Sequence, residues 1–126
     1  MGYQSGYSNT TGGKNSFLGY QSGYSSTNGS NNFYMGYHSG LNNNNGNQNV
    51  FIGTETGKLI TSGFDNIFIG HQSGNQTDVN SSQNIYLGTY TGYKNTGNNN
   101  IFISSNNSNL KQNTQTIANK FIVFND

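Results

Sequence analysis

Short apolar triplets recur along the chain, each preceded by asparagine and in nearly every copy followed by glycine. One copy reads Asn15-Ser-Phe-Leu-Gly19, and a later one reads Asn84-Ile-Tyr-Leu-Gly88. No apolar residue recurs three or four positions further on, and glycine interrupts the turn, so the triplets are not amphipathic helices. Each triplet predicts a strand of only a few residues, too short to be stable alone.

Glycine and hydroxyl residues keep a fixed phase with these triplets. The glycine after the triplet recurs at steps of 17 residues, with a last step of 18. A second glycine follows four residues later, always after a serine or threonine. The three columns are Gly2, Gly19, Gly36, Gly53, Gly70 and Gly88; Ser5, Ser22, Ser39, Thr56, Ser73 and Thr91; and Gly6, Gly23, Gly40, Gly57, Gly74 and Gly92. The chain is therefore an internal repeat.

A period of about 17 residues is too short for a helical hairpin and fits one coil of an all-β parallel solenoid. We expect one strand over each asparagine-led triplet and a second short strand before the second glycine. The asparagine column should form amide ladders along the axis. Residues 1–108 form the predicted repeat domain with six repeats, and residues 109–126 an irregular connection and a terminal cap strand.

Both faces of the predicted strand are apolar, which is typical of a strand buried on both sides. We place the aliphatic residue that ends each triplet in the coil core: Leu18, Met35, Ile52, Ile69, Leu87 and Ile103. We place the central aromatic residue at an interface between subunits: Phe17, Tyr34, Phe51, Phe68, Tyr86 and Phe102. Nothing else in the chain covers the second face, so we predict a homotrimer. The reverse assignment of the faces and a monomer with an exposed aromatic stripe are the alternatives.

Composition excludes several classes. Hydrophobic residues make up 29% of the chain and charged residues 7%, with a net charge of +1. With five lysines and no arginine there is no basic patch for nucleic acid. No apolar run exceeds four residues, so no membrane span is expected. The absence of cysteine excludes a disulfide framework.

The unit N-S-F-L-G-Y-Q-S-G-Y-S-S-T-N-G, residues 15–29, resembles the head repeats of trimeric autotransporter (YadA-like) adhesins. The longer G-Y-Q-S-G-Y-S-N-T-T-G, residues 2–12, is similar to repeats of viral and phage tail-fibre proteins. The resemblance covers residues 2 to about 108. It implies a left-handed β-roll of three chains around one axis, extracellular, on a bacterial cell surface or a virion fibre. The repeat here is longer than in adhesin heads, so its spacer should bulge outward.

Candidate chemistry is sparse. The four acidic residues, Glu55, Asp65, Asp78 and Asp126, share no repeat column, so we predict neither an enzyme nor a cofactor. His38 and His71 occupy different repeat positions; a metal ring in a trimer is the alternative to two surface histidines.

Exposed tyrosines provide the main alternative function, glycan binding, because a tyrosine ring offers an apolar face and a polar tip. The candidate contacts to a glycan or a surface receptor are Tyr20, Tyr37, Tyr24 and Tyr93. The hydroxyl column also raises ice binding, which the tyrosines between its members disfavour.

Overall fold

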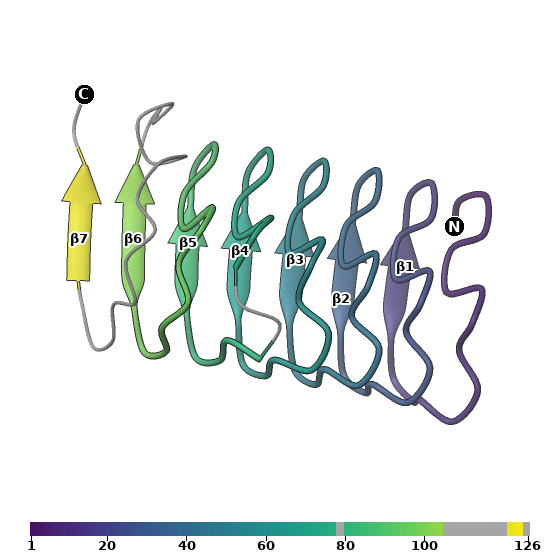
Figure 1. Cartoon of the computed structure of the whole chain (residues 1–126). Helices are drawn as coiled ribbons and strands as arrows, with labels where there is room; N and C mark the ends of the chain where they lie inside the picture. Colours follow the sequence, from purple (N-terminus) through teal and green to yellow (C-terminus); the bar gives the residue numbers. More distant parts are fainter. Residues whose placement is uncertain (78–79, 105–120, 125–126) are drawn as a thin grey trace.

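The described part of the chain forms one parallel sheet whose strands follow one another in sequence order. The structure, a computed structural model, describes residues 1–77, 80–104 and 121–124. In Figure 1 the arrows stand in one row and point the same way, and the connecting turns run along one side of the row. The parallel solenoid with one strand in each coil is confirmed. The strands are β1 (Ser16–Leu18), β2 (Phe33–Met35), β3 (Val50–Ile52), β4 (Ile67–Ile69), β5 (Ile85–Leu87), β6 (Ile101–Ser104) and β7 (Phe121–Phe124).

Successive coils are stacked in strict register. Phe17 pairs with Tyr34, and Phe68 pairs with Tyr86 across the 18-residue step. The ladder continues outside the strands, where the Gly23 N–H donates to the Ser39 carbonyl over 2.9 Å. Each coil is therefore held to the next around much of its circumference.

The core is a column of aromatic rings, one from the middle of each strand from β1 to β6. Tyr34, Phe51, Phe68 and Tyr86 are fully buried, and successive rings stack with centroids 4.5–5.2 Å apart. That separation matches the spacing of hydrogen-bonded strands. Each coil therefore places its ring at stacking distance from the ring of the next coil.

The predicted assignment of the two strand faces is wrong, and the reverse assignment holds. The residues expected at the subunit interface, Phe17, Tyr34, Phe51, Phe68, Tyr86 and Phe102, line the coil interior. The residues expected in the coil core, Leu18, Met35, Ile52, Ile69, Leu87 and Ile103, lie on the outer face, half-buried or exposed. The physical reason is width: one flat ring fills the narrow coil, and the pleat sends both of its strand neighbours outward.

Glycine makes room for the rings. Gly40 has φ +59°, and a Cβ there would lie 2.6 Å from ring atoms of Tyr34. Each member of the second glycine column meets the ring of a strand in the same way. The column is therefore required by the core as well as by the turn.

No second short strand is found in the described coils. Residues 20–25 form turns, with left-handed backbone at Gln21 and Gly23. The hydroxyl column beside these turns points inward: Ser22 and Ser39 are fully buried, and their Oγ atoms donate to the carbonyls of Tyr34 and Phe51. Buried hydroxyls leave no regular face for ice.

The asparagine ladder is confirmed, and it is buried from Asn32 onward. Asn49 Nδ2 donates to the Gly63 carbonyl over 2.8 Å, and Asn49 Oδ1 accepts from the Asn66 backbone N–H over 3.0 Å. The same pattern recurs from coil to coil along Asn15, Asn32, Asn49, Asn66, Asn84 and Asn100. These amides satisfy backbone groups that would otherwise be buried without a partner.

The predicted terminal strand is β7, which pairs with β6 in parallel and extends the sheet. The proposed boundary at residues 108 and 109, and the connection up to residue 120, lie outside the described residues.

Replacing Asn49 with alanine should lower the free energy of unfolding by about 2 to 5 kcal/mol, because the Gly63 carbonyl and the Asn66 N–H lose a buried partner. Asn45→Ala is the matched control, since Asn45 is an exposed asparagine of the same coil. It should change stability by less than about 0.5 kcal/mol. Denaturant unfolding measures both, and equal effects would contradict the ladder's role.

Candidate functional site: an exposed sheet face and its flanking columns

The outer face of the sheet is almost entirely apolar. We call the two outward columns together the outward sheet face. One column holds Ser16, Phe33, Val50, Ile67, Ile85, Ile101 and Phe121; the other holds Leu18, Met35, Ile52, Ile69, Leu87, Ile103 and Val123. Leu18 is 46% exposed, Ile69 39% and Phe121 69%, although each comes from a hydrogen-bonded strand. Ser16 is the one polar member, in the first strand.

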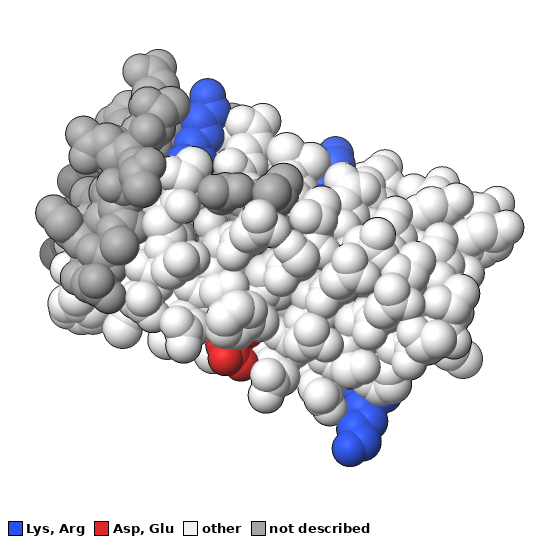
Figure 2. All heavy atoms as spheres, turned by 60° about the horizontal axis from the view of Figure 1, so that its bottom comes forward, with Lys and Arg blue, Asp and Glu red and all other residues white. Residues whose placement is uncertain are grey.

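Few charged side chains interrupt the surface of the molecule. Figure 2, which brings the bottom of Figure 1 forward, shows isolated lysine and acidic side chains on a surface that is otherwise uncharged. From the strand spacing, the outward sheet face is about 29 Å long, and its three-residue strands make it about 10 Å wide. A continuous apolar strip of this shape suits contact with another apolar surface.

Three of the four predicted ligand-contact tyrosines belong to two stacked rows. Tyr20 and Tyr37 are exposed and stack in one row with Tyr3, with centroids 5.4 Å apart. Tyr24 is half-buried and stacks on Tyr7, with centroids 5.3 Å apart.

Tyr93 belongs to neither row. It is half-buried and meets Tyr90 edge-on. Stacking covers the ring faces within the rows, so the rows present mainly ring edges and hydroxyl groups to solvent.

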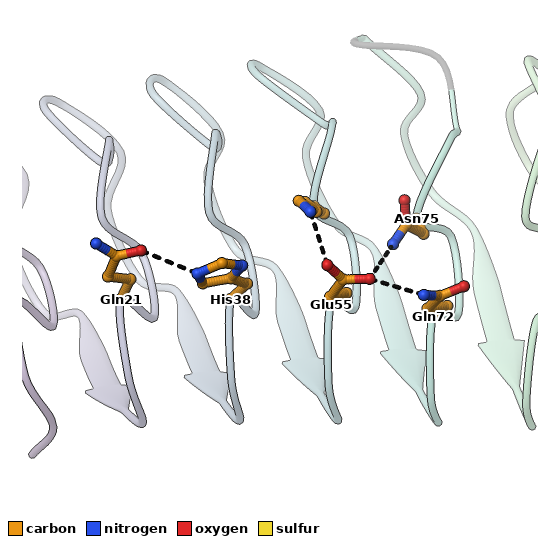
Figure 3. A network of polar contacts seen from close by, with 6 residues as sticks. Gln21, His38, Glu55, Gln72 and Asn75 are labelled. Atoms are coloured by element: carbon orange, nitrogen blue, oxygen red, sulfur yellow. Dashed lines mark hydrogen bonds and ion pairs between the residues drawn. The ribbon is translucent and has the colours of Figure 1, made fainter.

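A polar ladder lies beside the tyrosine row, at the residue after each tyrosine position. Gln21 Nε2 donates to Gln4 Oε1 over 2.8 Å, and His38 Nε2 donates to Gln21 Oε1 over 2.9 Å (Figure 3). His38 also stacks on Tyr37, with centroids 3.9 Å apart. Every described member of this column has left-handed backbone although none is glycine, with φ between 50° and 57°.

Glu55 is the centre of the ladder. Lys58 Nζ donates to Glu55 Oε1 over 2.7 Å and Gln72 Nε2 to Glu55 Oε2 over 2.7 Å, while Asn75 Nδ2 lies 3.5 Å from Oε2 (Figure 3). The sequence did not reveal this network to us, although the column is polar in every repeat up to Gln72 and ends in Tyr90. The ladder joins neighbouring coils at the surface.

The network shifts two pKa values. The hydrogen bond from Lys58, followed by that from Gln72, holds the pKa of Glu55 below its ordinary value despite partial burial. Partial burial and the Lys58 charge lower the pKa of His38, with Glu55 opposing them. His38 Nδ1 is buried and has no hydrogen-bond partner within the described chain, so a proton added there has no acceptor.

The described residues offer little reactive chemistry. Glu55 and Asp65 are the described acidic residues, and they occupy different columns of the solenoid. No group of three histidine, cysteine, aspartate or glutamate side chains in residues 1–77, 80–104 and 121–124 could hold a metal ion. A hollow at the amino-terminal end, lined among others by Met1, Phe17 and Met35, carries one charged residue, Lys14. No helix in the described segments is long and apolar enough to cross a membrane.

Comparisons of the chain with protein-family models, curated proteins and solved structures find no match. The role of the chain is therefore inferred from its own geometry, in which the outward sheet face is the largest departure from an ordinary soluble surface.

Acid should destabilise the fold in two steps, because both lowered pKa values mean that the unfolded chain binds more protons. The contribution of His38 is present above its ordinary pKa of 6.5 and is lost as the pH falls towards the lowered value. The contribution of Glu55 is present above 4.5 and is lost below it in the same way.

Chemical unfolding between pH 2 and pH 8 measures this dependence. His38→Gln, which copies its neighbour Gln21, should remove the loss that begins near the ordinary histidine pKa. Glu55→Gln should remove the loss at lower pH. An unchanged pH profile in both variants would contradict the assigned shifts.

Proposed function

We propose that the chain is a structural and attachment module of a homotrimeric surface fibre. Three left-handed β-rolls lie side by side around one axis, with their outward sheet faces packed together. The observation that carries the proposal is the outward sheet face, which runs over all seven described strands with a single polar member.

The energetic reason is the cost of leaving this face in water. Burying apolar surface contributes about 25 cal/mol per Å². The aromatic column already fills the interior of the described coils, so the aliphatic columns of these coils cannot turn inward. Other copies of the same chain supply a surface of matching length and chemistry. Threefold closure and left-handedness rest on the resemblance to adhesin heads and tail-fibre repeats.

The resemblance also supports the setting. A fibre module of this kind belongs outside the cell, on a bacterial surface or a virion, where it projects or forms a surface that meets a host. We propose no catalytic activity and no cofactor for it. Ladders of amides and stacked rings join each coil to the next, which suits a module that keeps its shape within a fibre.

A second candidate function is glycan binding on the same solenoid. The observation that favours it is the exposed row of Tyr3, Tyr20 and Tyr37. Since stacking covers the ring faces within the row, a sugar would be bound mainly through the tyrosine hydroxyls and ring edges rather than by lying flat on a ring.

The mass of the purified chain in solution tests the trimer. Light scattering should give about 41 kDa, three times 13.7 kDa. Ile69→Asp should dissociate the assembly, because it places a charge in the proposed contact. Asn45→Asp adds the same charge at an exposed corner and should leave the mass unchanged. Circular dichroism checks that both variants keep their sheet. A folded wild-type chain of 13.7 kDa would overturn the proposal.

Replacing Tyr20 and Tyr37 together with alanine separates the two candidate functions. Glycan-array or cell binding that survives the change leaves only the scaffold role. Binding lost at least tenfold, with the oligomer mass unchanged, would establish the tyrosine row as a ligand surface.

A further inference from the structure

Two columns of residues, all exposed except the half-buried Thr89, border the outward sheet face. The entry column lies two residues before each strand, and the exit column lies two residues after it. The entry column consists of Lys14, Asn31, Gln48, Asp65, Gln83 and Asn99; the exit column consists of Tyr20, Tyr37, Thr54, His71 and Thr89. All six entry residues have left-handed backbone, with φ between 56° and 60°, and all six are exposed.

Size makes these columns relevant to assembly. The outward sheet face alone covers about 300 Å² from its strand geometry, whereas a stable interface usually takes about 800 Å² from each partner. A subunit contact across this face must therefore extend onto its borders. The side chains of the two border columns then decide how the subunits align.

Symmetry determines which columns meet, given the proposed assembly of the previous section. Rotation about an axis parallel to the solenoid keeps every coil at its height. It brings the carboxyl ends of one copy's strands beside the amino ends of the next copy's strands. The exit column of one subunit then faces the entry column of its neighbour, coil by coil. Residues six apart in sequence become partners, such as Gln48 with Thr54.

Charge complementarity falls on one of these pairs. Asp65 is the acidic member of the entry column, and His71 is the histidine of the exit column in the same coil. Both are exposed, and the salt bridge found among the described residues, Lys58 with Glu55, uses neither. They lie on opposite borders of β4, six residues apart in sequence, and within the described structure no salt bridge joins them.

We propose that Asp65 of one copy accepts a hydrogen bond from the His71 ring of the neighbouring copy, and that this pair sets the register of the fibre. Slipping one subunit by a coil would place Asp65 opposite Thr54 or Thr89 and leave its charge without a partner. Exposed ion pairs add little stability, so the pair acts on alignment more than on affinity.

Cysteine crosslinking tests the pairing directly, because the natural chain contains no cysteine. The variant Asp65→Cys with His71→Cys should form disulfides between copies under mild oxidation, since a disulfide needs Cα atoms within about 7 Å. Non-reducing gels should show a covalent trimer that reduction returns to single chains. The matched control, Gln48→Cys with His71→Cys, uses the same two columns one coil out of register and should crosslink at least tenfold less.

The outcomes separate this pairing from the assembly itself. A trimer by light scattering that crosslinks better through Gln48→Cys, or through neither pair, overturns the Asp65–His71 register while the trimer stands. A covalent product that ends at two copies supports the pairing but overturns threefold closure. A monomeric natural chain overturns the proposed function and this pairing together.

Discussion

The stacking of one aromatic ring on the next is the interaction on which the rest of the structure depends. A ring stack and a β-ladder have nearly the same repeat distance, so a coil that supplies one ring and one strand satisfies both at once. This coincidence lets a chain of low hydrophobic content build a dry core. Glycine follows from the same constraint, because a Cβ at Gly40 would occupy the space of the Tyr34 ring.

Buried polar side chains form the hydrogen bonds that the aromatic core cannot supply. A coil only one ring wide leaves many backbone groups at its corners away from water, and they need partners. Asparagine answers this need twice, since its amide donates to one carbonyl and accepts from one N–H of the next coil. Serine in the hydroxyl column does the same for strand carbonyls. The polar composition first suggests a poor core, but many of these polar side chains lie in the interior.

The repeat, the parallel ladder and the asparagine column could be predicted from sequence because each follows from spacing alone. Which strand face lies inside could not be read from hydrophobicity, since both faces are apolar. The decisive signals were finer: the middle position is aromatic in all six copies, whereas the outer face admits Ser16. A position that always carries a large, flat side chain faces the coil interior, whose volume is fixed. A position that accepts serine faces outward.

The polar ladder around Glu55 escaped prediction for a different reason. Its members share left-handed backbone, a conformation that glutamine, histidine and glutamate do not predict in a sequence. The backbone turn aims these side chains along the axis, where Gln4, Gln21 and His38 bond in series and Gln72 bonds Glu55.

The single 18-residue step has a consequence for how such a molecule changes over time. Phe68 and Tyr86 remain paired across it, so the additional residue is absorbed between strands without disturbing the column of rings. Whole units can therefore be duplicated or lost, and corners can grow, while every neighbouring unit keeps its contacts. A gene that encodes this architecture can lengthen or shorten the solenoid in increments of one strand spacing. It can also enlarge the corners along one edge without changing the length of the solenoid.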